Sequence, residues 1–348
     1  MTRKLIAALL LVSLTLLSVC AYADGTLNVM NYGEYIDEEV IRNFEKEFGV
    51  KVNYALNDTP EAMYTKLQTG VSYDVVVTSD YMIDRLIKEE RILPLDKSIV
   101  TNLDQISDTM KGLYFDPDNT YSAPYLWQNV VLCYDTTKID PAKVEEKGWE
   151  ILLDPELDGH AFIYDSPRDV FMMAFKALGY SMNTDNPDEL QEAYEWLVKM
   201  KQTIHPSFVT DEMIDGMAQG EKWIAMMYSG DAAYASMENE KLAVWAPTQG
   251  TNIAIDCMFI PSNATNPEMA NQFINYVLDY DNSMMITVET CYTSPNAKVL
   301  EDVTAPGGEF EGVEGYLPRM GYEKDEIYQY VKLLQAETPE LLIKVQMQ

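Results

Sequence analysis

Residues 26–56 read TLNVMNYGEYIDEEVIRNFEKEFGVKVNYAL, and this stretch decides the fold class. An apolar strand-like run (26–31) is followed by an amphipathic helix-like run (37–48), which Gly49 ends, and by a second strand-like run (50–56). A strand, a helix and a strand in this order are typical of an α/β sheet with parallel strands. We therefore predict an α/β fold, and the alternation continues with a helix at 58–70, a strand at 73–78 and a helix at 81–90.

The same alternation returns in the second half of the chain. Its 348 residues exceed one ordinary hydrophobic core, which favours two domains. No low-complexity linker separates them, so we expect several strands to cross between the two lobes. Further strands are predicted at 129–135, 160–165, 223–228 and 256–264, and further helices at 168–178, 187–201 and 230–238, in two segments that reach about residue 289, and at 323–335.

The N-terminus has the layout of a secretory signal peptide. Two cations precede an apolar stretch, and the small residues Ala21 and Ala23 follow it. We therefore predict a signal peptide over residues 1–23 and a protein of the periplasm or another extracytoplasmic space. Cys20 leaves a lipid anchor open as an alternative to a soluble mature chain.

The amino-acid composition limits the kinds of molecule that the protein is expected to bind. The formal net charge of −31 repels nucleic acid and attracts cations. Outside the predicted signal peptide the cysteines are Cys133, Cys257 and Cys291, an odd number that predicts no closed disulfide framework.

Aromatic and acidic residues recur where the predicted strands end. In open α/β sheets, ligands bind outside the carboxyl ends of the strands. Carboxylates bind ammonium groups, and aromatic faces attract cations and cover methylenes, so this set suits an organic cation with an alkyl body. For any single position a structural role is the alternative, and Asp231 could cap the helix that follows it. The positions are Tyr32, Tyr35, Ser79, Tyr81, Ser166, Asp169, Tyr228 and Asp231, with Asp256 and Tyr292 in two later segments.

Seven motifs in order give the chain a family resemblance. It resembles the periplasmic spermidine/putrescine-binding proteins of polyamine ABC importers, over essentially the whole mature chain. The resemblance implies a type II periplasmic-binding-protein fold, in which two lobes with central mixed sheets are joined by crossover strands. We expect one lobe over 24–126 plus 252–296 and the other over 127–251 plus 297–348. The motifs are NYGEYI, YDVVVTSDYMIDRL, SAPYLWQNVVLCYD, YDSPRDVFMMAFKALGY, MMYSGDAA, IDCMFIPSNA and CYTSPNAK.

The resemblance also implies roles for the same ten strand-end residues as ligand contacts. Tyr32 and Tyr228 stand where the family usually has tryptophan. Asp169 falls where an acid binds a terminal amine, and Ser166 replaces an additional aspartate of spermidine-preferring members. Because Asp231 falls where putrescine-preferring members have an aspartate, we expect putrescine to be favoured over spermidine.

The expected function is capture of a polyamine between the lobes and delivery to an ABC permease with its ATPase. We expect a monomer without cofactor, bound metal or nucleic acid, which meets the membrane through the permease or a lipid anchor at Cys20. Two alternatives stay open. One is a receptor of the same fold for another cation such as ferric ion, since the chain has 23 tyrosines. The other is a secreted hydrolase that uses paired carboxylates, although no GxSxG or HExxH motif and no phosphate loop is present.

Overall fold

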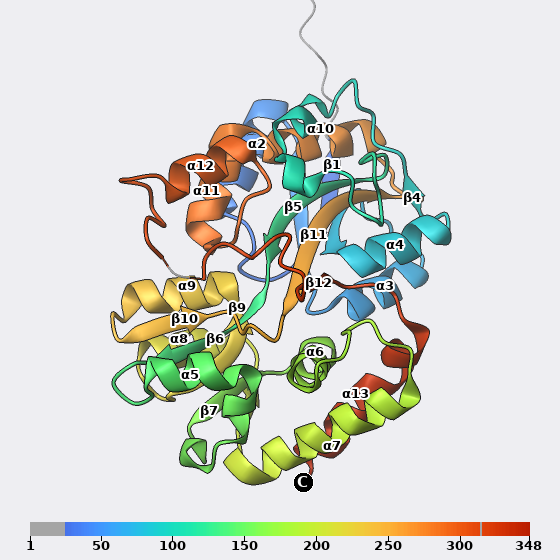
Figure 1. The fold of residues 1–348 in the computed structure, drawn as a ribbon. Coiled ribbons are helices and arrows are strands. Elements are labelled where there is room, and N and C mark those ends of the chain that lie inside the picture. Colours follow the sequence, from blue (N-terminus) through green and yellow to red (C-terminus); the bar gives the residue numbers. More distant parts are fainter. Residues whose placement is uncertain (1–24, 314) are drawn as a thin grey trace, which may run out of the picture.

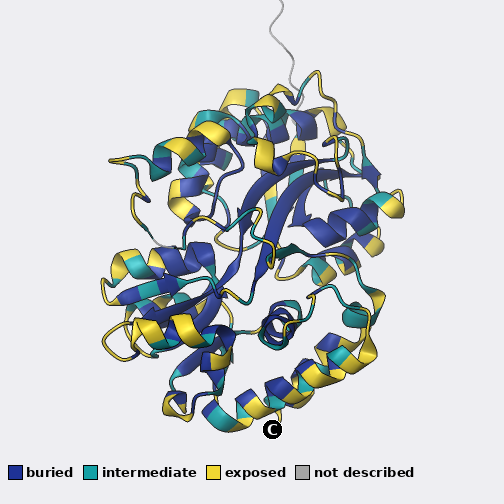
Figure 2. Ribbon diagram, viewed as in Figure 1, coloured by how far each residue is buried: buried dark blue, intermediate teal, exposed yellow. Residues whose placement is uncertain are grey.

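A computed structural model of the chain describes residues 25–313 and 315–348. The predicted signal peptide (1–23) and the alternative lipid anchor at Cys20 lie outside the described residues. The described chain forms two lobes, each with helices packed on a central β-sheet (Figure 1). The central strands of both sheets are buried, whereas the edge strand at 51–56 is partly exposed, as are the outer faces of the helices (Figure 2).

The first lobe is built on a seven-stranded mixed sheet. Its strands β1, β2 and β3 are parallel, whereas β11 runs antiparallel to β3. The strand order is β12-β11-β3-β1-β2, and β4 and β5 also pair with β11. The strands are β1 Thr26–Asn31, β2 Lys51–Leu56, β3 Val75–Ser79, β4 Ile92–Leu93, β5 Ser122–Gln128, β11 Asn252–Pro261 and β12 Glu326–Ile327. The helices of this part are α2 Glu38–Phe48, α3 Pro60–Gln68, α4 Asp80–Lys88, α10 Pro267–Val277, α11 Tyr280–Thr290 and α12 Ala297–Thr304, with short 3-10 turns at Thr101–Gln105 and Asp108–Met110.

The second lobe is built on a five-stranded mixed sheet. The strand order is β10-β6-β9-β7-β8: β6 Val130–Asp135, β7 Ala161–Tyr164, β8 Ser207–Val209, β9 Ile224–Tyr228 and β10 Leu242–Trp245. The helices are α5 Pro141–Lys147, α6 Pro167–Leu178, α7 Pro187–Ile204, α8 Glu212–Ala218, α9 Ser229–Glu238 and α13 Lys332–Gln346, with 3-10 turns at Gly148–Leu153 and Pro155–Leu157. Of these, α13 packs on α6 and α7.

Two strand connections cross between the lobes. Asn129 is the residue between β5 of the first sheet and β6 of the second, and residues 246–251 join β10 to β11. The two crossings are hydrogen-bonded to each other, because Val130 N donates to Asn252 Oδ1 (2.7 Å) and Thr251 Oγ1 donates to Val130 O (2.6 Å). The predicted two-lobed α/β fold with mixed sheets and crossover strands is therefore confirmed. The lobe boundaries stay a prediction, and β12, from the 297–348 segment, pairs with the first sheet.

Local sequence explains why the first elements form as predicted. Asp37 caps α2 by accepting a hydrogen bond from Glu39 N (2.7 Å), and Gly49 ends the helix with a left-handed φ of 65°. Thr59 caps α3 in the same way. All ten residues of β11 are buried, which agrees with the central position of this strand.

The prediction of a helix at 323–335 is wrong. Glu326 and Ile327 instead form β12, and α13 begins at Lys332 and continues to Gln346. The amphipathic pattern of 323–335 is overridden by long-range contacts, because the side chain of Glu326 is held by Lys176 and by the backbone N–H of Met182. Helix propensity predicts local structure poorly where charged side chains that are distant in sequence hold the backbone in an extended form.

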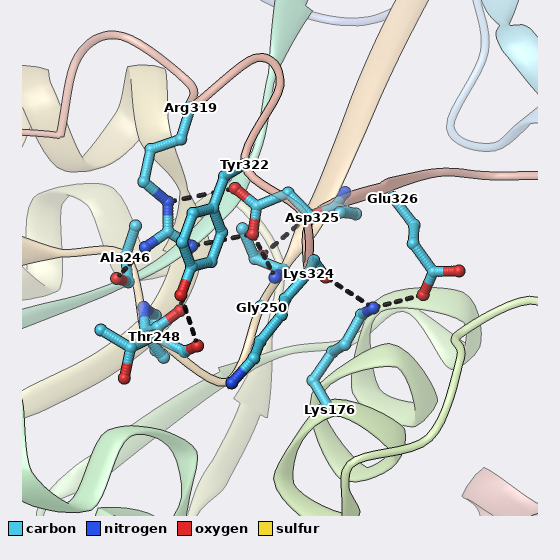
Figure 3. A network of polar contacts seen from close by, with 12 residues as sticks. Lys176, Ala246, Thr248, Gly250, Arg319, Tyr322, Lys324, Asp325 and Glu326 are labelled. Carbon is cyan, nitrogen blue, oxygen red and sulfur yellow. Dashed lines mark hydrogen bonds and ion pairs between the residues drawn. The ribbon is translucent and has the colours of Figure 1, made fainter.

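A C-terminal clasp, which we define as residues 319–328, ties the second lobe to the start of β11 (Figure 3). Arg319 donates to Asp325 (2.8 Å), which accepts a hydrogen bond from Thr251 N (2.9 Å). Lys176 of α6 forms an ion pair with Glu326. The side chain of Lys176 is 5% exposed, so this ammonium is buried and depends on its partners.

We expect Glu326→Gln to lower the free energy of unfolding by about 1–2 kcal/mol, because buried Lys176 loses a charged acceptor. Thermal melts followed by circular dichroism measure the effect. Adding Lys176→Met should recover most of the loss, since it removes the unpaired charge. Glu340→Gln is the matched control, because its pair with Lys344 is exposed. If Glu326→Gln melts like the wild type, the clasp does not stabilise the fold.

Candidate functional site

The predicted site residues come from both lobes, and most of them lie at or just after strand ends. In the first lobe, Tyr35 follows β1, Ser79 ends β3, and Asp256 pairs with Ser79 in the register of β11. In the second lobe, Asp169 lies in the first turn of α6 after β7, and Asp231 lies in the first turn of α9 after β9. The second-lobe carboxylates thus follow strand ends, whereas Asp256 lies within β11 opposite the end of β3.

Asp256 is the carboxylate of the first lobe. It is 3% exposed and accepts hydrogen bonds from Tyr35 Oη (2.8 Å) and Ser79 Oγ (2.7 Å). Burial raises the pKa of Asp256, and the two hydroxyl donors oppose the shift. Both hydroxyls hold the carboxylate in place and stabilise its charged form.

Asp231 is a carboxylate of the second lobe. Tyr228 occupies the cap position of α9 and makes no side-chain cap bond, so Asp231 is not the helix cap that the alternative interpretation suggested. Its Oδ1 accepts a hydrogen bond from Tyr292 Oη (2.8 Å). Burial raises the pKa of Asp231 to about 7, and exposed Asp211 and Glu34 add to the shift.

Two tyrosine rings connect these carboxylates. Tyr35 and Tyr292 pack edge to face, with ring centroids 4.9 Å apart. Asp256 therefore lies at the hydroxyl of one ring and Asp231 at the hydroxyl of the other. Gly230 permits this approach, because a Cβ there would lie 2.8 Å from the Tyr292 ring. We call these residues the carboxylate–tyrosine row: Tyr35, Asp231, Asp256 and Tyr292.

Asp169 has a different environment. It is fully buried, and its two oxygens accept hydrogen bonds from Tyr228 Oη (2.8 Å) and Tyr328 Oη (2.7 Å). Arg168 also pairs with it, since Arg168 Nε lies 3.5 Å from Asp169 Oδ1. Ser166 caps α6 by accepting a long hydrogen bond from Asp169 N (3.5 Å). Ser166 thus has a structural role in addition to its predicted place in the site.

The two remaining predicted residues, Tyr32 and Tyr81, contribute aromatic rings. Tyr32 packs edge to face on Tyr35 at 5.8 Å. The hydroxyl of Tyr81 donates to Glu61 (2.7 Å), while its ring lies 5.2 Å from the guanidinium of Arg168. Tyr81 thus presents its ring rather than its hydroxyl to that guanidinium.

Sequence reasoning missed three residues of the site. Arg168 stands in the quoted YDSPRD motif, directly before Asp169, so its charge was a usable signal. Tyr328 lay in the wrongly predicted C-terminal helix and gave no signal. Tyr125 packs on Tyr35 with centroids 5.6 Å apart; it stands in the quoted SAPYLWQNVVLCYD motif, but no strand was predicted there to place it in the site.

The described residues, 25–313 and 315–348, contain neither a metal-binding cluster nor a membrane-spanning helix. Within these residues His, Cys, Asp and Glu do not gather into a group of three or more that could hold a metal ion. No helix there combines the length and apolar character that a membrane span requires. The three cysteines in this range are buried and unpaired.

Comparisons with known proteins identify the family of the chain. A family model described as bacterial extracellular solute-binding protein matches residues 39–308. The spermidine/putrescine-binding periplasmic protein of Salmonella typhimurium is 35% identical over 297 residues, which cover 85% of this chain and 84% of that protein. The chain belongs to the family of periplasmic spermidine/putrescine-binding proteins.

Other members of the spermidine/putrescine-binding family are similarly close. The putrescine/cadaverine-binding protein of Pseudomonas aeruginosa is 30% identical over 304 residues, covering 84% of this chain and 86% of that protein. The solved structure of PotD, the substrate-binding protein of a spermidine/putrescine ABC transporter from Streptococcus pneumoniae, has a TM-score of 0.77 at 30% identity and covers 93% of this chain and 99% of that chain. The family, the fold and the extracytoplasmic location predicted from the sequence are confirmed.

Proposed function

We propose that this chain captures a polyamine between its lobes, with putrescine favoured over spermidine, and delivers it to an ABC importer. One observation carries the proposal: Asp231 and Asp256 are buried carboxylates, and each accepts a hydrogen bond from one hydroxyl of the Tyr35–Tyr292 pair. Within residues 25–313 and 315–348 neither forms an ion pair with a lysine or arginine.

The chemistry of this row suits a diamine. A buried carboxylate without a cation is costly, and an ammonium group of the ligand removes that cost. Putrescine carries two ammonium groups on a four-carbon chain, so each could bind one of the two carboxylates by charge-assisted hydrogen bonds. The tyrosine faces between them would cover the methylenes and attract the cationic ends.

The names of the relatives support the same ligand class. The Salmonella relative is named for spermidine and putrescine, and the Pseudomonas relative for putrescine and cadaverine. Putrescine and cadaverine are both diamines, which agrees with a site that has two anchoring carboxylates.

The hydrogen bonds of the tyrosines favour an ammonium ligand over ferric ion, because in the ligand-free protein these hydroxyls are donors to carboxylates. Ferric receptors bind the metal through tyrosinate oxygens, which requires deprotonated hydroxyls. Burial raises the pKa of Tyr35, Tyr228 and Tyr292 well above the ordinary value, so these hydroxyls stay protonated and donate to carboxylates. Binding rather than hydrolysis also agrees with the relatives, which are named as binding proteins.

Calorimetric titration of purified, ligand-stripped protein tests the proposal. The ligands are putrescine, spermidine, spermine, an amino acid and ferric citrate. We expect micromolar or tighter binding of putrescine, weaker binding of spermidine, and no heat from the amino acid or ferric citrate. Heat from ferric citrate without heat from the polyamines would overturn the proposal in favour of the ferric receptor.

Delivery requires a membrane partner, and we infer an ABC permease driven by its ATPase, with this chain acting as a monomer. The inference follows from the names of the relatives, of which PotD belongs to an ABC transporter. Stimulation of putrescine uptake by the cognate transporter in liposomes tests the partnership. Uptake that does not depend on the purified binding protein would contradict it.

Ligand binding should close the lobes, and Gly230 provides a test. We expect Gly230→Ala to weaken putrescine binding by about 1–3 kcal/mol, since its methyl group would push the Tyr292 ring away from Asp231. Because the same methyl group crowds the buried Tyr292 ring, the thermal midpoint without ligand should also fall, so affinities are compared at a temperature where the variant is folded.

Small-angle scattering with and without putrescine measures closure in the same variant. The wild type should become more compact with ligand, as hinge-type receptors do, and Gly230→Ala should do so less. Gly33→Ala is the matched control, because a Cβ at Gly33 meets nothing within 4 Å. Equal compaction and equal affinity in Gly230→Ala and the wild type would contradict the role of this contact.

A further inference from the structure

The two lobes are in contact with each other in this structure. The hydroxyl of Tyr292, which follows α11 of the first lobe, donates to Asp231 of α9 in the second lobe (2.8 Å). The guanidinium of Arg168 in the second lobe lies 5.2 Å from the ring centroid of Tyr81 in the first. We call this arrangement closed. Opening it bends the chain where it crosses from one lobe to the other.

The crossings carry two amide side chains on one face of the paired chains. The antiparallel strands β5 and β11 run side by side into the crossings (Figure 1), and their ladder pairs Gln128 with Ala254. Two positions further along β11, Asn252 Oδ1 accepts the N–H of Val130 on the opposite chain (2.7 Å). Because side chains two residues apart on a strand share a face, Gln128 and Asn252 are diagonal neighbours, within reach of a long side chain.

Both amides are buried, and each leaves one polar atom without a partner. Gln128 is 6% exposed and Asn252 is fully buried. Gln128 Oε1, an acceptor, and Asn252 Nδ2, a donor, make no hydrogen bond within the described residues. Asn129 Oδ1, at the same crossing, is a further buried acceptor without a partner there. Buried polar atoms that lack a partner are uncommon and costly, so the closed arrangement carries an energetic cost at its hinge.

The backbone of the crossings, by contrast, is held by hydrogen bonds. Thr251 Oγ1 donates to Val130 O (2.6 Å), and Thr251 N donates to Asp325 of the C-terminal clasp (2.9 Å). These bonds keep the two chains together, so they bend as a pair around the point where Gln128 and Asn252 are neighbours. A bend there changes the diagonal distance between the two side chains more than it changes the backbone bonds.

We propose that Gln128 and Asn252 form a hinge switch, in which their side chains hydrogen-bond to each other when the lobes are open and are unpaired when the lobes are closed. The bond of the open state and the unpaired atoms of the closed state act in the same direction, so the ligand-free protein is held open. A ligand that bridges the lobes supplies the free energy that separates the pair. The inference depends on lobe closure and not on which cation closes the lobes.

Small-angle scattering and calorimetry of Gln128→Met test the switch. Methionine resembles glutamine in length but has no oxygen to accept Asn252, so the closed state loses an unpaired acceptor and the open state loses a hydrogen bond. Without ligand the variant should be more compact than the wild type. It should bind putrescine about 5- to 50-fold more tightly, because more of it is already closed. Gln128→Leu lacks the same oxygen and carries the test if Gln128→Met does not fold.

Gln272→Met is the matched control. Gln272 Oε1, on α10, is also buried and without a partner among the described residues. Helix α10 packs on the first sheet, outside both crossings. The control should therefore change stability but keep the compactness and the putrescine affinity of the wild type.

The outcomes separate this inference from the proposed function. If Gln128→Met is as open as the wild type and binds putrescine equally, the switch is overturned; a water that bridges the two amides in both arrangements would give this result. A wild type whose ligand-free scattering matches the closed structure would also overturn it. If no polyamine binds but Gln128→Met is more compact than the wild type, the proposed function fails and the switch stands.

Discussion

Replacing Asp231 with asparagine is expected to weaken putrescine binding by about 2–5 kcal/mol, or about 30- to 5000-fold in Kd. The substitution keeps the shape and a hydrogen-bond acceptor for Tyr292 but removes the charge that one ammonium needs. Calorimetry of ligand-stripped protein measures the change. Asp302→Asn is the matched control, because Asp302 also accepts a tyrosine hydroxyl, that of Tyr280 at 2.8 Å, but lies on α12 outside the carboxylate–tyrosine row.

The pH dependence of putrescine binding provides a second test of the role of Asp231. Burial raises the pKa of Asp231 to about 7, so this group takes up a proton below pH 7 and loses its attraction for ammonium. Wild-type Kd for putrescine should therefore rise as pH falls below 7, by up to about tenfold per pH unit, and Asp231→Asn should lack this slope. A variant that binds putrescine normally at pH 8 would show that Asp231 is not an anchor.

The folding stability of the ligand-free protein should change with pH in the opposite direction to the affinity for putrescine. Because the folded pKa of Asp231 is raised above its unfolded value, the folded state binds more protons between about pH 4 and 7, and stability falls as pH rises through this window. Asp231→Asn should therefore melt like the wild type below about pH 4 and later than the wild type above pH 7. Earlier melting of the variant at pH 8 would indicate a structural role.

Replacing Asp256 with asparagine is expected to cost putrescine binding a similar amount, about 2–5 kcal/mol, because it removes the anchor of the other ammonium. Its effect on stability should differ from that of Asp231→Asn. Asp256 accepts two hydroxyl donors, from Tyr35 and Ser79, and an asparagine offers only one oxygen to them. The free energy of unfolding without ligand should therefore fall by about 1–2 kcal/mol.

Calorimetry and chemical denaturation of Asp256→Asn separate these two effects. Tyr35→Phe is a useful companion, since it removes one donor to Asp256 and leaves the carboxylate charged. It should weaken putrescine binding less than Asp256→Asn does. Equal loss in the two variants would mean that the hydroxyl, and not the charge at Asp256, determines binding.

Local signals made the first lobe predictable. Asp37, Gly49 and Thr59 mark helix ends by their own backbone and side-chain chemistry, and the observed α2 and α3 begin and end beside them. By contrast, β5 was not predicted, and it contains Pro124, a residue that is unusual within a paired strand. The strand forms because a register shift in its pairing with β11, between Asp256 and Cys257, accommodates the irregularity.

The site was predictable where residues follow strand ends and was missed where contacts are long-range. Asp231 stood out because it directly follows a predicted strand, whereas Asp256, which lies within β11, was indicated by its residue type and by the family resemblance. Tyr328 reaches Asp169 across 159 positions of sequence, and Glu326 reaches Lys176 across 150. No local pattern contains such pairs, so they could be found only in the folded chain.

A crystal structure of the protein with bound putrescine tests the central claim most directly. We predict that the four-carbon chain lies along Tyr35 and Tyr292, with one ammonium within hydrogen-bonding distance of Asp231 and the other within hydrogen-bonding distance of Asp256. Putrescine bound outside this row, or bound with either carboxylate free of an ammonium, would contradict the account.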